Sequence, residues 1–177
     1  MAYNAGSQSG NLVLIQKKTA SNSASIDFTT GITGYDIYKL IINDMIVQTS
    51  GQKIILQYSN DAGSSWITTN YSTQGAIART AAGLQGLDES LTGHEIFNSA
   101  DNGSSFPCNG EITMYGLSNS AVNKLCYINT CFFIAGGVFW HSLASQQLTT
   151  AVVTGLRVIS ASGNIVSGTF KLYGVAN

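Results

Sequence analysis

Apolar and polar residues alternate along several short stretches of the chain, with the two-residue period of a half-buried strand. In the segment KIILQYS at 53–59, every second side chain from Ile54 to Tyr58 is apolar, and the positions between them become polar along the segment. β-Branched and aromatic residues dominate these stretches, which favours strands over helices. The pattern predicts an all-β protein.

Strands are expected wherever this alternation is bounded by residues typical of turns. The expected strands are residues 11–18, 24–28, 35–47, 53–59, 66–71, 111–117, 123–134, 138–143, 152–160 and 165–175. We expect a bulge near 43–44, pairing of 53–59 with 35–47, and a hairpin turn at 162–164. Roughly nine to eleven strands are too many for one flat sheet and indicate an antiparallel β-sandwich that is jelly-roll-like.

The chain is expected to form one domain, because 177 residues suffice for a single core. Residues 1–10 have no apolar period and are predicted to be a flexible N-terminal arm for docking or linking. Residues 11–177 form the predicted sandwich domain. Within it, glycines punctuate residues 72–110, which we expect to be loop-rich, with at most a short helical turn at 76–84.

Charged residues make up only 10% of the chain, and the formal net charge is −1. Such a surface sets up little long-range field, so nucleic acid is not an expected partner. The longest apolar run, 131–140, is half the length of a membrane helix and contains two glycines, which excludes membrane insertion by that segment. The first residues lack the basic and apolar regions of a secretory signal, so folding in the cytosol is expected.

Three cysteines, Cys108, Cys126 and Cys131, cannot all pair with one another. Folding in the cytosol favours reduced thiols. If Cys126 and Cys131 share a strand, their odd separation places them on opposite faces, where they neither bridge nor bind a metal together. We therefore interpret the cysteines as small packing residues.

The segment SNDAGSSW at 59–66 matches the Asp-box of sialidases, S-x-D-x-G-x-x-W, at every fixed position. A turn explains the same residues, since Asp61 can cap it, Gly63 can adopt the left-handed conformation, and Trp66 can fold back over it. Sialidases repeat this motif and bind a carboxylate with an arginine cluster. This chain has one copy of the motif and two arginines, so we favour the turn.

Acid and base groups are scarce, and their densest cluster is Asp88, Glu89, His94 and Glu95. These residues could hold a metal or act on a glycosidic bond, but solvated loop polarity also explains them and is favoured. His141 lies on an apolar strand and is expected to be a hydrogen-bonded or rim residue. No phosphate-binding loop, nucleophile elbow or zinc-protease motif occurs. We expect no enzymatic activity, no cofactor and no metal.

Aromatic side chains offer another kind of site, because a ring stacks on the apolar face of a sugar while amides and hydroxyls bind its hydroxyl groups. The candidate ligand-binding residues lie in or beside the irregular middle segment and are Tyr71, His94, Phe97 and Phe106. The alternative is that the aromatic residues among them anchor their loops to the core. Glycan binding is therefore a hypothesis with named residues.

Three segments carry a resemblance to a known group: SASIDFTTGI at 23–32, YDIYKLIINDMI at 35–46, and ISASGNIVSGTFKLYGVAN from 159. Over residues 12–175 the chain resembles small bacteriophage virion structural proteins and tail-fibre tip domains. The resemblance implies a jelly-roll-like sandwich, a homotrimer or other symmetric oligomer, and a place on the virion exterior. It supplies no catalytic residues.

The expected function is that of a bacteriophage virion structural protein, synthesised in the host cytoplasm. Our first hypothesis is a host-recognition subunit of the tail fibre or baseplate that binds a surface polysaccharide. The alternative is a capsid decoration or fibre-connector protein that binds other virion proteins. A depolymerase or glycosidase is the third hypothesis.

Overall fold

The computed structural model describes the backbone of residues 11–79, 83–134 and 137–176, and their side chains except at 79, 83–90 and 134. Every regular element in these ranges is a β-strand. In chain order, the strands are β1 Leu12–Thr19, β2 Ser25–Phe28, β3 Ile37–Val47, β4 Gln52–Ser59, β5 Tyr71–Arg79, β6 Gly83–Leu91, β7 His94–Ala100, β8 Cys108–Tyr115, β9 Lys124–Ile134, β10 Gly137–Gln147, β11 Gly155–Ser160 and β12 Ile165–Val175. The predicted all-β class is confirmed.

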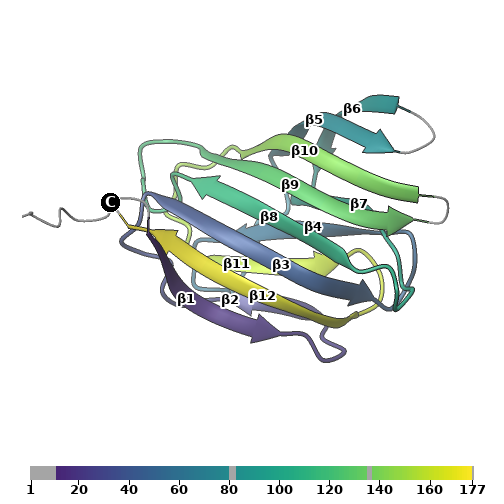
Figure 1. Cartoon of the computed structure of the whole chain (residues 1–177). Helices are drawn as coiled ribbons and strands as arrows, with labels where there is room; N and C mark the ends of the chain where they lie inside the picture. The colour runs from purple at the N-terminus through teal and green to yellow at the C-terminus, as the bar shows by residue number, and fades with distance from the viewer. Residues whose placement is uncertain (1–10, 80–82, 135–136, 177) are drawn as a thin grey trace, which may run out of the picture.

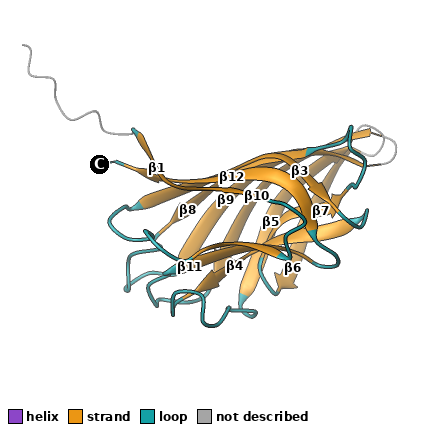
Figure 2. Ribbon diagram, turned by 90° about the horizontal axis from the view of Figure 1, so that it is seen from below, coloured by secondary structure: helices purple, strands orange, loops and turns teal. Residues whose placement is uncertain are grey.

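The strands form two stacked antiparallel sheets (Figures 1 and 2). The larger, eight-stranded sheet has the order β1-β12-β3-β8-β9-β10-β5-β6. The smaller, four-stranded sheet has the order β2-β11-β4-β7. The predicted β-sandwich is therefore confirmed.

The strand order is that of a jelly roll with two additions. Strands β1-β12-β3-β8 face β2-β11-β4-β7, and the chain crosses between the sheets from β1 through β4 and again from β7 to β8 and from β11 to β12. These eight strands make up the two nested Greek keys of a jelly roll. The hairpins β5–β6 and β9–β10 are insertions, and both extend the larger sheet on the same side (Figure 1).

The hydrophobic core lies between the sheets, where alternate residues of each strand point inward. In β3, buried and partly exposed positions alternate for most of its length, and Tyr38, Leu40 and Ile42 are fully buried. Leu56 from β4 and Phe170 from β12 join the same core. Burial of these side chains is the main term that stabilises the sandwich.

Several predicted strands are confirmed with small shifts in their ends. Strands β3 and β12 lie within the ranges expected at 35–47 and 165–175. The expected bulge is present, because the register between β3 and β8 shifts between Ile42 and Met45 and Asp44 has a φ of 53°. The expected arm at 1–10 lies outside the described residues.

The structure corrects the loop-rich middle expected at 72–110. This segment contains β5, β6, β7 and the start of β8, and it brings the described strands to twelve. Strands β5 and β6 are rich in small and polar residues, so their sequences show little alternation. Their extended form is selected by pairing, of β5 with β10 and of β6 with β5. The segment 66–71 is not the expected strand, since β5 begins only at Tyr71.

Two expected pairings are also wrong. Strand β4 does not pair with β3 but lies in the other sheet, between β11 and β7. The turn at 162–164 carries the chain from β11 in one sheet to β12 in the other, so it closes no hairpin. Alternation marks a strand, but it does not reveal whether the next strand pairs with it or crosses to the facing sheet.

Candidate functional site

A groove of about 370 Å³ crosses the outer face of the larger sheet. Its lining comes from four neighbouring strands, β8, β9, β10 and β5. Ala144 lies at its low point, because the register places this small residue between Tyr127 on β9 and Gln74 on β5. The groove falls within the size range of pockets that bind small ligands, roughly 300–1,000 Å³.

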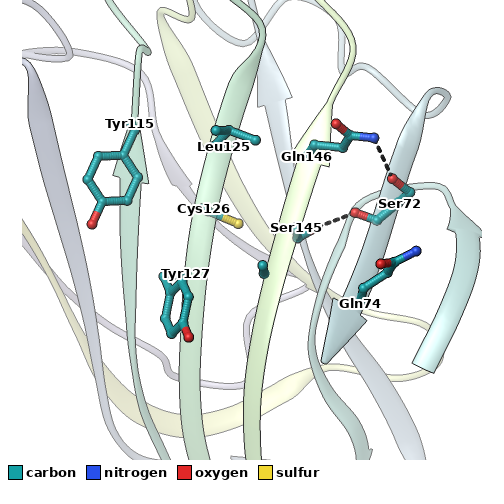
Figure 3. A pocket seen from close by; sticks show the side chains of 9 residues that line it. Ser72, Gln74, Tyr115, Leu125, Cys126, Tyr127, Ser145 and Gln146 are labelled. Atoms are coloured by element: carbon teal, nitrogen blue, oxygen red, sulfur yellow. Dashed lines mark hydrogen bonds between the residues drawn. The ribbon is translucent and has the colours of Figure 1, made fainter. Parts of the chain in front are cut away.

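One side of the groove is aromatic. Tyr115 and Tyr127 project from β8 and β9 with 42% and 49% of their surface exposed (Figure 3). Both occupy outward positions, since Met114 and Cys126 beside them point into the core. Exposed tyrosine rings are suited to stacking on a flat, weakly polar ligand while their hydroxyl groups donate or accept hydrogen bonds.

On the other side of the groove, the described side chains are polar and uncharged. Gln74, Gln146 and Ser72 lie opposite the tyrosines (Figure 3). The amide Nε2 of Gln146 donates a hydrogen bond of 3.0 Å to Oγ of Ser72, which fixes the position of both side chains. None of the described residues that line the groove carries a full charge. The arrangement suits a neutral ligand that is rich in hydroxyl groups.

A buried polar network lies beneath the polar side. Ser145 donates from Oγ to the carbonyl of Ser72 at 2.9 Å, and the same hydroxyl oxygen lies 2.8 Å from Oγ1 of Thr73 and 2.7 Å from Nδ1 of His94. The His94 ring is packed edge-on against Tyr58 and Tyr71, with ring centres 4.6 and 4.8 Å away. Burial lowers the pKa of His94 to about 3 and keeps the ring neutral. The network joins the groove to the core.

Three of the four candidate ligand-binding residues are not at the surface, which corrects the sequence prediction. Tyr71, His94 and Phe97 are buried between the sheets and cannot contact an external ligand. Phe106 is exposed, and its ring centre lies 5.4 Å from that of Phe133. It does not line the groove. The prediction for Tyr71, His94 and Phe97 is wrong because these residues lie on β5 and β7, where alternate side chains point into the core, and not on loops.

The residues that line the groove were missed because they lie on ordinary strands. The alternation of 124–134 does signal an outward set that contains Leu125, Tyr127 and Phe133, all of them exposed and apolar or aromatic. The alternation within one strand does not indicate which neighbouring strands complete the groove. The pairing of β10 with β5 brings Gln74 to the tyrosines from more than forty residues away in the sequence.

The acid–base cluster expected around His94 is divided between two faces. His94 points into the core, whereas Glu95 lies on the opposite side of β7 and pairs with Lys53 at 2.9 Å. The side chains of Asp88 and Glu89 lie outside the described residues. Among the described side chains, no group of three or more His, Cys, Asp or Glu residues could hold a metal ion.

The Asp-box segment forms the expected turn. The Asp61 carboxylate accepts hydrogen bonds from the hydroxyls of Ser59 and Ser65, at 2.6 and 2.5 Å, and from the Ser65 N–H at 2.9 Å. These bonds, with that from Ser59 the strongest, lower the pKa of Asp61 to about 2. Gly63 has a φ of +88°, and a β-carbon at this position would lie only 3.3 Å from the Trp66 ring. The motif therefore has a structural role here.

Trp66 also holds one of the two arginines of the chain. The Arg157 guanidinium lies 4.2 Å from the centre of the Trp66 ring, and it donates two hydrogen bonds, of 2.9 and 2.8 Å, to the Asp27 carboxylate. This engagement leaves Arg157 as a structural cation on the smaller sheet. It is not placed to bind a ligand carboxylate as sialidase arginines do.

A second hollow, of about 620 Å³, lies near the turn that follows β8. It is lined by Tyr35, Asp36, Gly116, Ser118, Asn119 and Ser120. The Ser118 hydroxyl already bonds to the Tyr38 hydroxyl at 3.0 Å, and the Tyr35 ring packs edge-on against Tyr38. The Tyr35 ring already packs against another residue of the protein, so the groove between β8 and β5 is the better candidate site.

No family model matches the chain, and no curated protein or solved structure is significantly similar to it. In the described part of the chain, no helix is long and apolar enough to cross a membrane. The candidate site is therefore defined by the side chains of the groove itself.

Proposed function

We propose that this chain is a non-enzymatic subunit of a bacteriophage virion that binds a neutral surface glycan in the groove between β8 and β5. The groove carries the proposal, because it combines two exposed tyrosine rings with fixed amide and hydroxyl groups, and none of its described side chains has a full charge. A sugar ring presents an apolar face to stack on a tyrosine and hydroxyl groups for the amides opposite. The aromatic side of the groove therefore matches the apolar face of a sugar, and the polar side matches its hydroxyl groups.

The absence of charge narrows the class of glycan. Sugars with carboxylate or sulfate groups gain most from arginine or lysine side chains at the site. Such side chains do not occur among the described residues that line the groove. The proposed ligand is accordingly a neutral oligosaccharide, and not a sialic acid or uronic acid polymer.

A binding role without catalysis is supported by where the described acids and bases lie. His94 and His141 are buried, and burial lowers the pKa of both imidazoles below the neutral range. Glu95 is buried and paired with Lys53. No carboxylate or imidazole is among the described groups that line the groove. Glycoside hydrolysis needs two carboxylates flanking the bond to be cleaved.

The virion setting rests on the resemblance of residues 23–46 and 159–177 to phage structural proteins. A jelly-roll sandwich is the architecture that this resemblance implies. We place the subunit on the virion exterior as a homotrimer, as the resemblance implies, with other virion proteins as partners. In a tail fibre or baseplate, the groove would bind the surface glycan of the host during recognition.

The proposal is tested with a glycan array that carries neutral and acidic bacterial surface saccharides, followed by calorimetric titration of the strongest ligand. We expect binding to neutral saccharides. Tyr127→Ala should weaken that binding about tenfold, because an aromatic stacking contact contributes on the order of 1–1.5 kcal/mol.

Tyr173→Ala is the matched control, since Tyr173 lies on β12 of the same sheet but outside the groove. Its affinity should equal that of the unchanged protein. Equal losses in both variants, or binding only to acidic saccharides, would rule out the groove as the glycan site.

A further inference from the structure

A ridge of large apolar side chains stands on the outer face of the larger sheet, beyond one end of the groove. We define the ridge as Cys131 and Phe133 on β9 with Val138 and Trp140 on β10. Phe133, Val138 and Trp140 are 36%, 48% and 46% exposed, and Cys131 is exposed as well. Phe133 faces Val138 and Cys131 faces Trp140 across the strand pair, so the four side chains form one patch.

A flat area of small side chains adjoins the ridge. This shelf consists of Ala76 and Ala78 on β5 and Ser142 on β10. Ala78 is directly opposite Trp140, and Ala76 is directly opposite Ser142. A tall apolar surface and a low one therefore lie side by side on the same face of the sheet.

Charge is distributed unevenly over this face. The outward positions of β3, β8 and β12 include Lys39, Glu111 and Lys171. The ridge, the shelf and Asn129 beside them carry no charged side chain. Two copies that meet through such a surface bring no like charges together, which a charged surface facing itself would do.

We propose that the ridge and shelf form a self-association surface, in which the ridge of one copy packs on the shelf of a second copy of this chain. A second copy fits because each copy carries both halves of the contact, so that the ridge of one copy meets the shelf of the next around a closed ring such as a trimer. Apolar side chains of this size, exposed together, are typical of an interface core, and tryptophan is the most frequent hot-spot residue.

The surface is separate from the proposed glycan site. On β9, Asn129 lies between Tyr127 of the groove and Cys131 of the ridge. On β10, Ser142 lies between Ala144 of the groove and Trp140. No residue of the ridge or shelf lines the groove, although Ser142 and Ala76 of the shelf adjoin Ala144 and Gln74 of the groove. The two proposals are therefore tested with separate variants.

Sedimentation velocity over a range of concentrations tests the proposal and counts the copies. The unchanged protein should form a defined oligomer. Trp140→Asp should raise its dissociation constant at least about 30-fold, because the variant places a carboxylate against the partner's shelf. Leu14→Asp is the matched control, since Leu14 is an exposed apolar residue on the opposite edge strand β1 of the same sheet, and it should leave the oligomer unchanged.

A second measurement starts from the native protein. Cys131 is exposed, whereas Cys108 and Cys126 are buried. A flexible bismaleimide should thus join two copies of the native protein through Cys131, and Cys131→Ser should abolish the product. Tyr127→Ala should assemble normally, and Trp140→Asp should keep the affinity of a single groove for its saccharide. A protein that stays monomeric and yields no cross-linked product would overturn the proposal.

Discussion

At the scale of single residues, the Ser145 hydroxyl is the group through which the polar side of the groove is hydrogen-bonded to the core. This hydroxyl has one hydrogen, which it donates to the carbonyl of Ser72. The Thr73 hydroxyl and Nδ1–H of His94 must then donate to Ser145, which assigns the neutral tautomer of His94 with its proton on Nδ1. One buried oxygen thus satisfies two donors from two different strands.

Ser145→Ala should lower the free energy of unfolding by about 1–3 kcal/mol, because it leaves buried donors on Thr73 and His94 without an acceptor. Urea denaturation followed by circular dichroism measures this loss. Ser142→Ala, on the outer face of the same strand, should change the free energy by less than about 0.5 kcal/mol. If the two variants were equally stable, the network would carry no net stabilisation.

At the scale of elements, Gly75 determines how closely β5 approaches β10. A β-carbon at this position would meet the backbone carbonyl of Ser142 and the Cα of Leu143, and the φ of Gly75 is +155°. No larger residue fits without moving one strand. The polar side of the groove stands on β5, so its distance from the tyrosines depends on this glycine.

Gly75→Ala should therefore weaken glycan binding and lower the free energy of unfolding by about 1–3 kcal/mol, the usual cost of overpacking. Calorimetric titration and thermal unfolding measure the two effects. Gly34→Ala is a useful comparison, since Gly34 also has a positive φ, of +87°, but its β-carbon would meet nothing within 4 Å. It should lose stability without losing affinity, and a normal affinity in Gly75→Ala would contradict the packing argument.

The sequence predicts elements better than it predicts their partners. Alternation located β3, β4, β9 and β12, because each has one buried face. It fails for β5 and β6, whose small residues form strands because β5 pairs with β10, about sixty residues further on, and β6 pairs with β5. The groove needs side chains from β8, β9, β10 and β5 together, so it could not be found before the sheet order was known. Tyr127 was visible in the pattern, but Gln74 was not.

At the scale of the whole molecule, the two buried histidines make stability depend on pH. Burial lowers the pKa of His94 to about 3 and that of His141 to about 4, from an ordinary value of 6.5. Below pH 6.5 the unfolded chain therefore binds protons that the folded protein does not, and folding becomes less favourable as the pH falls.

We expect the free energy of unfolding to decrease between pH 6.5 and about 4, with a slope that approaches about 1.4 kcal/mol per pH unit for each histidine. Denaturant titrations at several pH values measure the slope. His141→Leu should make it shallower, because only His94 then contributes. A slope unchanged by this substitution would mean that His141 is not kept neutral in the folded protein.

The two inserted hairpins allow the binding surface of this protein to change by substitution without a change in fold. The inward residues of β5, β9 and β10 belong to the one hydrophobic core, as Ile77, Ile128 and Leu143 show. The ridge, the shelf and the groove residues Gln74, Tyr127 and Ala144 stand on the opposite, outward face of the same three strands. Outward substitutions on these three strands leave the inward residues, and with them the fold, in place. Ligand preference can therefore diverge quickly between otherwise similar chains, and an engineer could exchange the outward residues of the hairpins to redirect the protein to another ligand.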